Sequence, residues 1–167
     1  MYDANHLISR LRAASITHET RNFATFPARA SMTFGELFAG SERNAAALVG
    51  MGVKPGDRVA VQVEKTIDAI QLYLGTVMAG GVFLPLNTAY TTPEVAYFLG
   101  DASPRVVVCD PAREDDIAEI AGDARVVTLD GKGLGSLTDA VWGRGGFGPL
   151  PRAPCVLARG RVTQGTH

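Results

Sequence analysis

Hydrophobic positions along this chain switch between two periods, one typical of strands and one typical of helices. In residues 58–64 (RVAVQVE), every second residue is a valine, which is the two-residue period of a β-strand. From about residue 66 to 79, apolar residues recur every three or four positions, as on one face of a helix. Gly80-Gly81 ends this pattern, so residues 58–81 predict a strand followed by a helix.

Three more strands and three more helices are expected downstream. The strands are expected at residues 82–86, 105–110 and 125–130, and the helices from Thr91 or Thr92 to about Gly100, over 112–121 and over 135–142. Residues 105–110 (RVVVCD) are apolar without alternation, which is typical of a strand covered on both faces. Pro85 has no N–H group to donate, so the strand at 82–86 is expected at a sheet edge. Strands that alternate with helices predict a doubly wound, mainly parallel α/β sheet with flanking helices.

The N-terminal third begins with a different pattern. Residues 4–14 predict a short amphipathic helix whose apolar face carries Leu7, Ile8 and Leu11. Two strands of a hairpin are expected at ITHET and ARASMTF, with Pro27 in the connection. A second helix is expected to begin at a capping box formed by Thr33 and Glu36, and to end at Gly52 in a left-handed conformation.

Composition is that of a single soluble domain. The chain has 167 residues, of which 46% are hydrophobic and 20% charged, with a net charge of −1. There is no basic field to attract nucleic acid, and no apolar run long enough to cross a membrane. Cys109 and Cys155 form no disulfide framework, so a reducing, cytoplasmic compartment is expected. Arg10 and Arg12 faintly resemble a mitochondrial presequence, but a helix that packs on the domain is favoured.

A change in composition near Trp142–Gly143 predicts a domain boundary. The last acidic residue is Asp139, and the sequence beyond it is rich in Gly, Pro and Arg. We therefore expect a domain over residues 1–142 and a tail over residues 143–167. The tail is expected to be disordered or the product of out-of-frame reading, although PCVLARGRV could add one strand.

Residues with reactive or metal-binding side chains are scattered. The histidines lack the spacing of zinc ligands, and they are His6, His18 and His167. The acidic run at Glu114, Asp115 and Asp116 is explained by a helix start, where carboxylates complement the helix dipole. Lys65 follows a strand at the end where ligands often bind in open α/β sheets, but a solvated lysine at a helix start is favoured.

Glycine and serine residues also have structural explanations. Gly80-Gly81 lies between a helix and a strand, which is the reverse of the order in a phosphate loop. No G-x-x-x-x-G-K-[ST] or G-x-S-x-G pattern occurs. Residues 143–148 do spell G-x-G-x-x-G, but the glycines there, among them Gly145, Gly146 and Gly148, have no expected strand before them and no expected helix after them, whereas a dinucleotide-binding loop requires both. Turn or cap positions are expected for the serines Ser31, Ser41, Ser103 and Ser136. The residues by themselves therefore assign no catalytic, cofactor-binding or metal-binding position.

Four segments, in order and at the expected spacing, resemble the opening third of the adenylate-forming acyl-CoA synthetases. They are MTFGEL at 32–37, VKPGDRVAV at 53–61, TVMAGGVFLPLN at 76–87 and YTTPEVAYFLGDASPRVVVCD at 90–110. Within that superfamily, AGGVFLPLNTAYT and FLGDASPRVVVCDP are most similar to the malonyl-CoA synthetases. The resemblance implies that the fold is part of the N-terminal domain of an adenylate-forming enzyme.

The resemblance also implies a reaction. Enzymes of this family use Mg²⁺ and ATP to convert a carboxylate into an acyl-adenylate with release of pyrophosphate, and coenzyme A then displaces AMP. The family's phosphate loop, similar to YTSGTTGxPKG, should come near residue 160, where this chain reads VLARGRVTQGTH. No catalytic, cofactor-binding or metal-binding residue of the family can therefore be carried over to this chain.

We accordingly expect an N-terminal fragment of a ligase that is inactive alone. A non-catalytic α/β binding module and one part of a split ligase are the alternatives. The expected partner is the missing remainder of the synthetase, and helices that would meet it should expose apolar surface.

Overall fold

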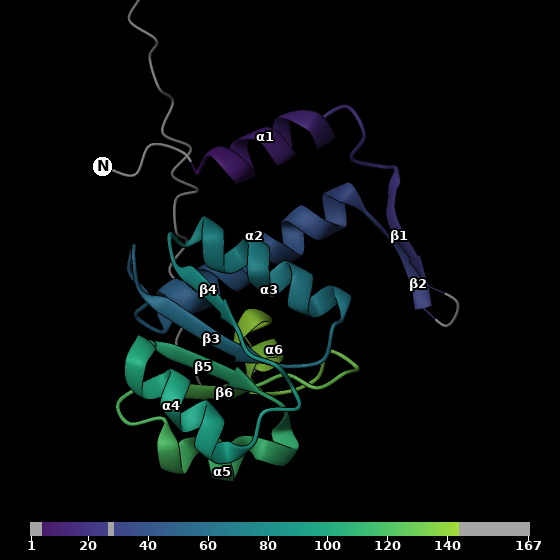
Figure 1. Ribbon diagram of the computed structural model, residues 1–167. Helices are drawn as coiled ribbons and strands as arrows, with labels where there is room; N and C mark the ends of the chain where they lie inside the picture. The colour runs from purple at the N-terminus through teal and green to yellow at the C-terminus, as the bar shows by residue number, and fades with distance from the viewer. Residues whose placement is uncertain (1–4, 27–28, 144–167) are drawn as a thin grey trace, which may run out of the picture.

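The computed structural model describes residues 5–26 and 29–143, and its main body has three layers (Figure 1). A sheet of four parallel strands forms the middle layer, in the order β4-β3-β5-β6. The strands are β3 (Arg58–Gln62), β4 (Val82–Pro85), β5 (Val106–Cys109) and β6 (Arg125–Thr128). The predicted parallel α/β sheet is confirmed.

Helices cover both faces of this sheet, as a doubly wound fold requires. One face is covered by α2 (Phe34–Gly50), α3 (Ile67–Met78) and α6 (Ser136–Val141). The other is covered by α4 (Thr92–Ala102) and by α5 (Glu114–Ile120), which follows the short 3-10 turn η1 (Pro111–Arg113).

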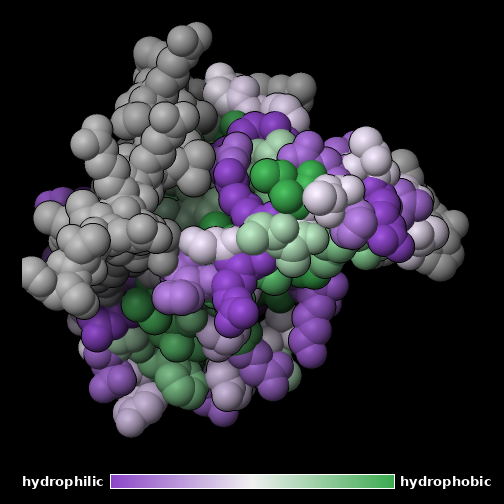
Figure 2. Space-filling view, turned by 90° about the horizontal axis from the view of Figure 1, so that it is seen from above, coloured by the Kyte–Doolittle hydropathy of each residue, from purple (hydrophilic) through white to green (hydrophobic). Residues whose placement is uncertain are grey.

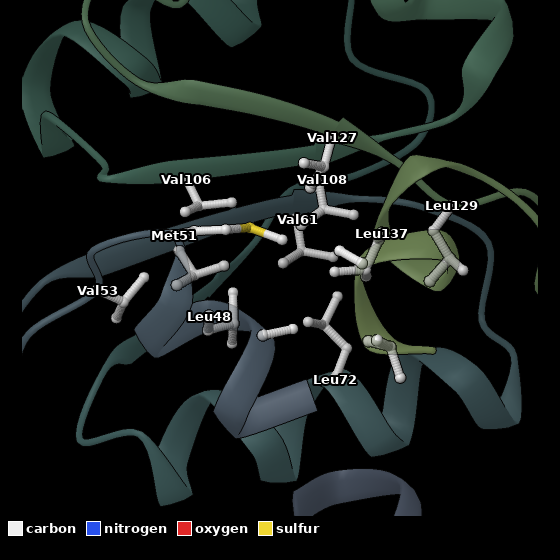
Figure 3. Close-up of a cluster of buried hydrophobic side chains, with 14 residues drawn as sticks. Leu48, Met51, Val53, Val61, Leu72, Val106, Val108, Val127, Leu129 and Leu137 are labelled. Carbon is white, nitrogen blue, oxygen red and sulfur yellow. The ribbon is translucent and has the colours of Figure 1, made fainter. Parts of the chain in front are cut away.

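The alternating side chains of the strands divide the core into two clusters. Side chains that point toward α2, α3 and α6 form the cluster drawn in Figure 3, with Leu48, Leu72 and Leu137 contributed by the helices. Ala60, Val107 and Cys109 point to the opposite face and pack against α4 and α5. All residues of β5 are buried because β5 is an inner strand with helices over both faces, as predicted for its continuous apolar run.

Strand β4 is an edge strand, as Pro85 predicted. The N–H groups of Val82 and Leu86 donate to the carbonyl oxygens of Asp57 and Val61, on the β3 side. Because successive N–H groups of a strand point in opposite directions, the nitrogen of Pro85 faces the open edge. Pro85 therefore removes no hydrogen bond from the sheet.

The close packing of α2 on α3 depends on glycine. A Cβ atom added to Gly75 on α3 would lie 2.6 Å from Cβ of Asn44 and 2.8 Å from the carbonyl oxygen of Ser41, both on α2. The hydroxyl of Ser41 forms its hydrogen bond within α2, where Oγ donates to the carbonyl oxygen of Leu37 over 2.8 Å. The backbones of the two helices can thus approach closely only because position 75 has no side chain.

The helix termini follow the sequence signals closely. Thr33 and Glu36 form the predicted capping box at the start of α2, and Gly52 has the expected positive φ of 90° after its end. Thr91 caps α4 in a second capping box with Glu94. This helix continues past Gly100 to Ala102, where Ser103 takes the left-handed conformation instead.

The N-terminal segments agree only in part with the sequence prediction. Helix α1 (His6–Ser15) is present, but Leu7 and Leu11 stay 42% and 40% exposed. Its contact with α2 includes polar groups, since the guanidinium of Arg12 pairs with Glu42 and lies 5.6 Å from the ring centroid of Phe38.

The first strand of the hairpin was placed wrongly at ITHET. Strand β1 is Asn22–Phe26, and it pairs antiparallel with β2 (Arg29–Thr33). Residues 16–20 are not extended, because the N–H of His18 donates to the carbonyl of Ser15 and the N–H of Arg21 to that of His18. Pro27 lies outside the described residues, so its place in the connection stays a prediction.

The described part of the chain contains no helix long and apolar enough to cross a membrane. Its surface does expose large hydrophobic side chains, and hydrophobic patches lie between hydrophilic ones on the face seen from the α1 side (Figure 2). Helix α6 ends at Val141, next to the predicted boundary. Residues 144–167 lie outside the described ranges, so the predictions for the tail are not tested.

Candidate functional site

The carboxyl ends of β3 and β5 meet at the point where the chain reverses its direction across the sheet. From β3 the chain passes through α3 to the outer strand β4, and α3 covers one face. From β5 it passes through η1 and α5, which lie on the opposite face, to β6. Two neighbouring strands that connect to opposite faces leave a crevice beyond their carboxyl ends, where open α/β sheets bind ligands. This switch point is the first candidate site.

A network of polar side chains fills the switch point. Gln62 is the last residue of β3 and only 2% exposed. Its amide nitrogen donates to the carbonyl oxygens of Asn87, over 2.8 Å, and Tyr90, over 3.3 Å. Arg113, which ends η1, donates from Nη1 to Oε1 of Gln62 over 2.7 Å and to the carbonyl of Tyr90 over 2.9 Å. Its Nη2 donates to Oγ1 of Thr92 over 3.1 Å.

These contacts join three separate connections at the carboxyl edge. Arg113 follows β5, Gln62 ends β3, and residues 87–92 form the loop between β4 and α4. The ring of Tyr90 also stacks on Phe98 of α4, with centroids 5.2 Å apart. Because the guanidinium and the amide bond to internal groups, the network holds the loop against the sheet. Its role is therefore to position the loop.

Cys109 lies beneath this network at the end of β5 and is fully buried. Burial raises the pKa of its thiol to about 11, and the negative charge of Glu114 adds to that effect while Arg113 opposes it. A thiol of this pKa is neutral near pH 7, and the thiolate is the nucleophilic form. Cys109 is therefore a core residue and has the wrong properties for a catalytic nucleophile.

The connection from β6 to α6 is the second candidate, because it has the order of a phosphate loop. The sequence from Asp130 to Ser136 is DGKGLGS, a glycine-rich segment between a strand and a helix. The carboxylate of Asp130, however, accepts the N–H groups of Lys132 and Leu134 through Oδ1, each over 2.8 Å. The pKa of the Asp130 carboxyl is lowered, chiefly by the hydrogen bond from the N–H of Leu134. The N–H groups of Lys132 and Gly133 and the charge of Lys132 lower it further, whereas desolvation raises it.

The start of α6 is satisfied internally as well. The N–H of Ser136 donates to Oγ1 of Thr128 over 3.0 Å, and the N–H of Thr128 donates to Oγ of Ser136 over 2.9 Å. The amides of Lys132, Gly133, Leu134 and Ser136 therefore already have acceptors, and the carboxylate of Asp130 would repel a second anion. The described residues do not fit the triphosphate of ATP at this loop.

The candidates named from the sequence do not come together. Lys65 is exposed at the carboxyl edge, between β3 and the Thr66 cap of α3, in agreement with a solvated helix-start lysine. The three acidic residues at 114–116 are exposed in the first turn of α5, as the dipole explanation requires. His6 and His18 are exposed, and no group of three potential metal ligands exists within the described ranges. His167 lies outside those ranges.

The glycine and serine explanations hold for some positions and fail for others. Gly80, with φ of 80°, ends α3 as predicted. Ser103 ends α4, and Ser136 begins α6. Ser31 is instead inside β2 and Ser41 inside α2, so a turn or cap was the wrong explanation for these two. A helix tolerates Ser41 because its hydroxyl bonds to a carbonyl one turn earlier. Gly145, Gly146, Gly148 and Cys155 lie outside the described residues.

The polar groups that organise the carboxyl edge were missed from the sequence. Gln62 carries a weak signal, as a polar residue on a strand that is otherwise apolar at its buried positions. Arg113 carries none, because its partners lie at the end of β3 and in the β4–α4 loop, which only the fold brings next to it. The DGKGLGS segment does have a visible signal, the order strand, glycine-rich loop and helix, but the sequence does not reveal that Asp130 occupies the loop amides.

Comparison with known proteins decides the family. The sequence model of the AMP-binding enzyme family matches residues 12–142. The chain belongs to this family. The match covers the described sheet and all of the helices that flank it. Membership confirms the resemblance to adenylate-forming enzymes, and it places the switch point and the β6–α6 loop in the N-terminal region of such an enzyme.

Solved structures of the AMP-binding family show the same fold. The apo form of MatB from Rhodopseudomonas palustris is 53% identical, with a TM-score of 0.69, over 70% of this chain and 24% of MatB. ATP-bound MatB from the same organism is 47% identical, with a TM-score of 0.72, over 80% of this chain and 27% of MatB. The long-chain-fatty-acid–CoA ligase FadD13 of Mycobacterium tuberculosis is 34% identical over 77 residues, which are 46% of this chain and 15% of the ligase. The chain thus spans about a quarter or less of the length of these relatives.

Proposed function

We propose that this chain is the N-terminal part of an ATP-dependent malonyl-CoA synthetase and that it does not form an acyl-adenylate by itself. The 53% identity with MatB, a malonyl-CoA synthetase, carries the proposal. A benzoate CoA ligase from Burkholderia xenovorans has a similar TM-score of 0.70 but is only 24% identical. The fold is common to both, whereas the sequence is much more similar to MatB.

The inability to act alone is proposed from the two candidate sites. The switch point is filled by Gln62 and Arg113, and the amides of Lys132 and Leu134 in the β6–α6 loop donate to Asp130. No family phosphate-loop pattern occurs anywhere in the sequence. Binding of ATP with Mg²⁺, and of coenzyme A, is therefore assigned to the part of the enzyme that this chain does not span. That remainder is the proposed partner, and a cytoplasmic location is part of the same proposal.

The test is complementation by the corresponding remainder of a relative. We define the MatB remainder as the part of R. palustris MatB that follows the segment aligned with this chain. Pyrophosphate release from ATP and malonate would be measured with the chain alone, with the MatB remainder alone, and with both. We expect release only from the mixture, because only then are the scaffold and the ATP site present together.

Two controls make each outcome informative. The N-terminal piece of MatB itself, mixed with the MatB remainder, shows that the split enzyme can reassemble. The remainder of the benzoate CoA ligase, assayed with benzoate, is expected to be activated at least about 10-fold less, since its own N-terminal region is less similar. Release from the chain alone would refute the proposed inactivity. Silence of the mixture, when the MatB piece is active, would refute the assignment to a malonyl-CoA synthetase.

A further inference from the structure

Arg43 on α2 and Trp142 at the end of α6 form a surface that we call the Arg43–Trp142 corner. Cζ of Arg43 lies 4.4 Å from the centroid of the indole ring, within the range of a cation–π interaction. Trp142 is 56% exposed, although its neighbours Ala140 and Val141 are buried in the core. A large aromatic side chain is thus held in place by a cation while much of its surface stays in water.

One donor of the guanidinium at this corner lacks a hydrogen-bond acceptor among the described residues. Nε of Arg43 is buried, and it has no hydrogen-bond acceptor among the residues that the structure describes. Stacking on the indole satisfies the face of the guanidinium but not the N–H groups in its plane. A buried donor without an acceptor is unfavourable, and such groups in folded proteins nearly always have a partner.

Acidic side chains of this chain do not supply that acceptor in the described structure. Glu42, the next residue along α2, is already paired with Arg12. The sequence from residue 144 to 167 contains no Asp or Glu and adds four arginines. A side-chain carboxylate for Arg43 must therefore come from another polypeptide segment.

The family comparison indicates which segment this is. The match to the AMP-binding family ends at Trp142, yet apo MatB is aligned over only 24% of its own length. Most of the length of such a relative therefore lies outside the part that matches this chain, and Trp142 is the last residue of the matched range. The corner thus lies at the end of the matched range, and Trp and Arg are among the residues enriched at the energetic centres of interfaces.

We propose that the Arg43–Trp142 corner is the docking surface for the part of the AMP-binding fold that this chain does not span, and that the docked polypeptide places a carboxylate against Arg43. This inference rests on the proposed function and adds to it the location and chemistry of the contact. The indole provides apolar contact area, and the planar guanidinium orients the carboxylate through paired hydrogen bonds.

The experiment measures binding of the full chain to the MatB remainder, without ATP or malonate. Trp142 is the only tryptophan of the chain, so 5-fluorotryptophan incorporated into the chain gives a single ¹⁹F resonance at the corner. We expect this resonance to shift when the MatB remainder is added. Trp142→Ala and Arg43→Met should each weaken the affinity at least about 30-fold, as expected for central interface residues. Added salt should weaken binding of the wild type more than binding of R43M.

Matched controls use side chains on other surfaces. Arg58→Met removes an exposed arginine at the start of β3, and Tyr97→Ala removes an aromatic residue that is 73% exposed on α4. Both should leave the affinity within about 2-fold of wild type, because neither side chain is at the corner. Arg43→Lys, which retains the charge without the planar group, should give an intermediate affinity.

Unchanged affinity of W142A and R43M would overturn the proposal, and so would a complete absence of binding by the wild type. A ¹⁹F shift that depends only on the concentration of the chain would assign the corner to a second copy and also overturn it. The proposed function can be refuted independently of the docking surface. If the MatB remainder binds through the corner but the mixture releases no pyrophosphate, the proposed function is wrong and the docking surface is still supported. If the R43M and W142A variants, each mixed with the MatB remainder, release pyrophosphate as fast as the wild type does, the docking surface is refuted and the proposed function stands.

Discussion

Replacing Gly75 with alanine tests whether α2 and α3 are as close as the structure shows. The new Cβ would lie 2.6 Å from Cβ of Asn44, 2.8 Å from the carbonyl oxygen of Ser41 and 3.0 Å from the backbone nitrogen of Ala45. Two of these three neighbours are backbone atoms of α2, so a side-chain rotation cannot relieve the contact. The helices must move apart by several tenths of an ångström, and the core beneath them must follow.

The net effect follows from two opposing contributions. Alanine in the interior of a helix is more favourable than glycine by about 1 kcal/mol. Overpacking of a well-packed core costs about 1–3 kcal/mol, and the rigid neighbours place this site near the upper end. We therefore expect Gly75→Ala to lower the free energy of unfolding by about 2 kcal/mol.

Gly100 on α4 is the matched control. It is exposed, and an added Cβ would meet no atom within 4 Å. Without a clash, only the helix propensity changes, so Gly100→Ala should raise the free energy of unfolding by about 0.5–1 kcal/mol. Gly40→Ala tests an intermediate case, because the three atoms nearest to its Cβ would all belong to the side-chain amide of Gln71. That side chain can move away if it gives up its hydrogen bond to the carbonyl of Glu36.

Urea denaturation followed by circular dichroism gives the three free energies, and an unchanged m-value shows that they are comparable. A Gly75→Ala variant as stable as the wild type would refute the close helix contact. Equal stabilisation by Gly75→Ala and Gly100→Ala would show that only helix propensity matters at both positions.

Three further predictions concern single side chains. Arg113→Met removes the charged donor of the switch-point network, so the free energy of unfolding in urea should fall by about 3 kcal/mol; a change below about 1 kcal/mol would show that the network is not a structural tie. In a Cys155→Ser variant, Cys109 should react with a thiol reagent at pH 8 only after unfolding. Because folding raises the pKa of Cys109 from 9.0 to about 11, its contribution to stability is complete below pH 9 and is lost as the pH rises toward 11; rapid reaction of the folded protein would contradict its burial. Hydrogen bonds from the helix caps lower the pKa of Glu36 and of Glu94, so their contribution is complete above the unfolded value of 4.5 and is lost as the pH falls through the lower folded values. The double variant Glu36→Gln, Glu94→Gln should show a smaller loss of stability between pH 5 and pH 3 than the wild type, and an identical pH profile would refute this.

The sequence by itself determined most local elements of the main body. Thr33 with Glu36 marked where α2 begins, because a capping box satisfies backbone groups within four residues, and the start of α4 was predicted at Thr91 or Thr92. The apolar run at 105–110 predicted the buried strand β5, and Pro85 predicted the edge position of β4. These features depend on the chain's own backbone or on simple burial, so short segments are sufficient to specify them. The family, too, was apparent from four such segments.

Tertiary structure decided the features that depend on residues distant in sequence. Whether residues 16–20 or 22–26 form a strand depends on turns and on pairing with β2, which the local pattern does not specify. The contact at Gly75 needs a second helix, and the role of Arg113 needs groups from three connections. The loop after β6 has the glycine pattern of an anion site, yet folding turns the carboxylate of Asp130 onto its amides and closes it to a phosphate. A sequence specifies which groups are available, but only the folded chain determines which of them have already found partners.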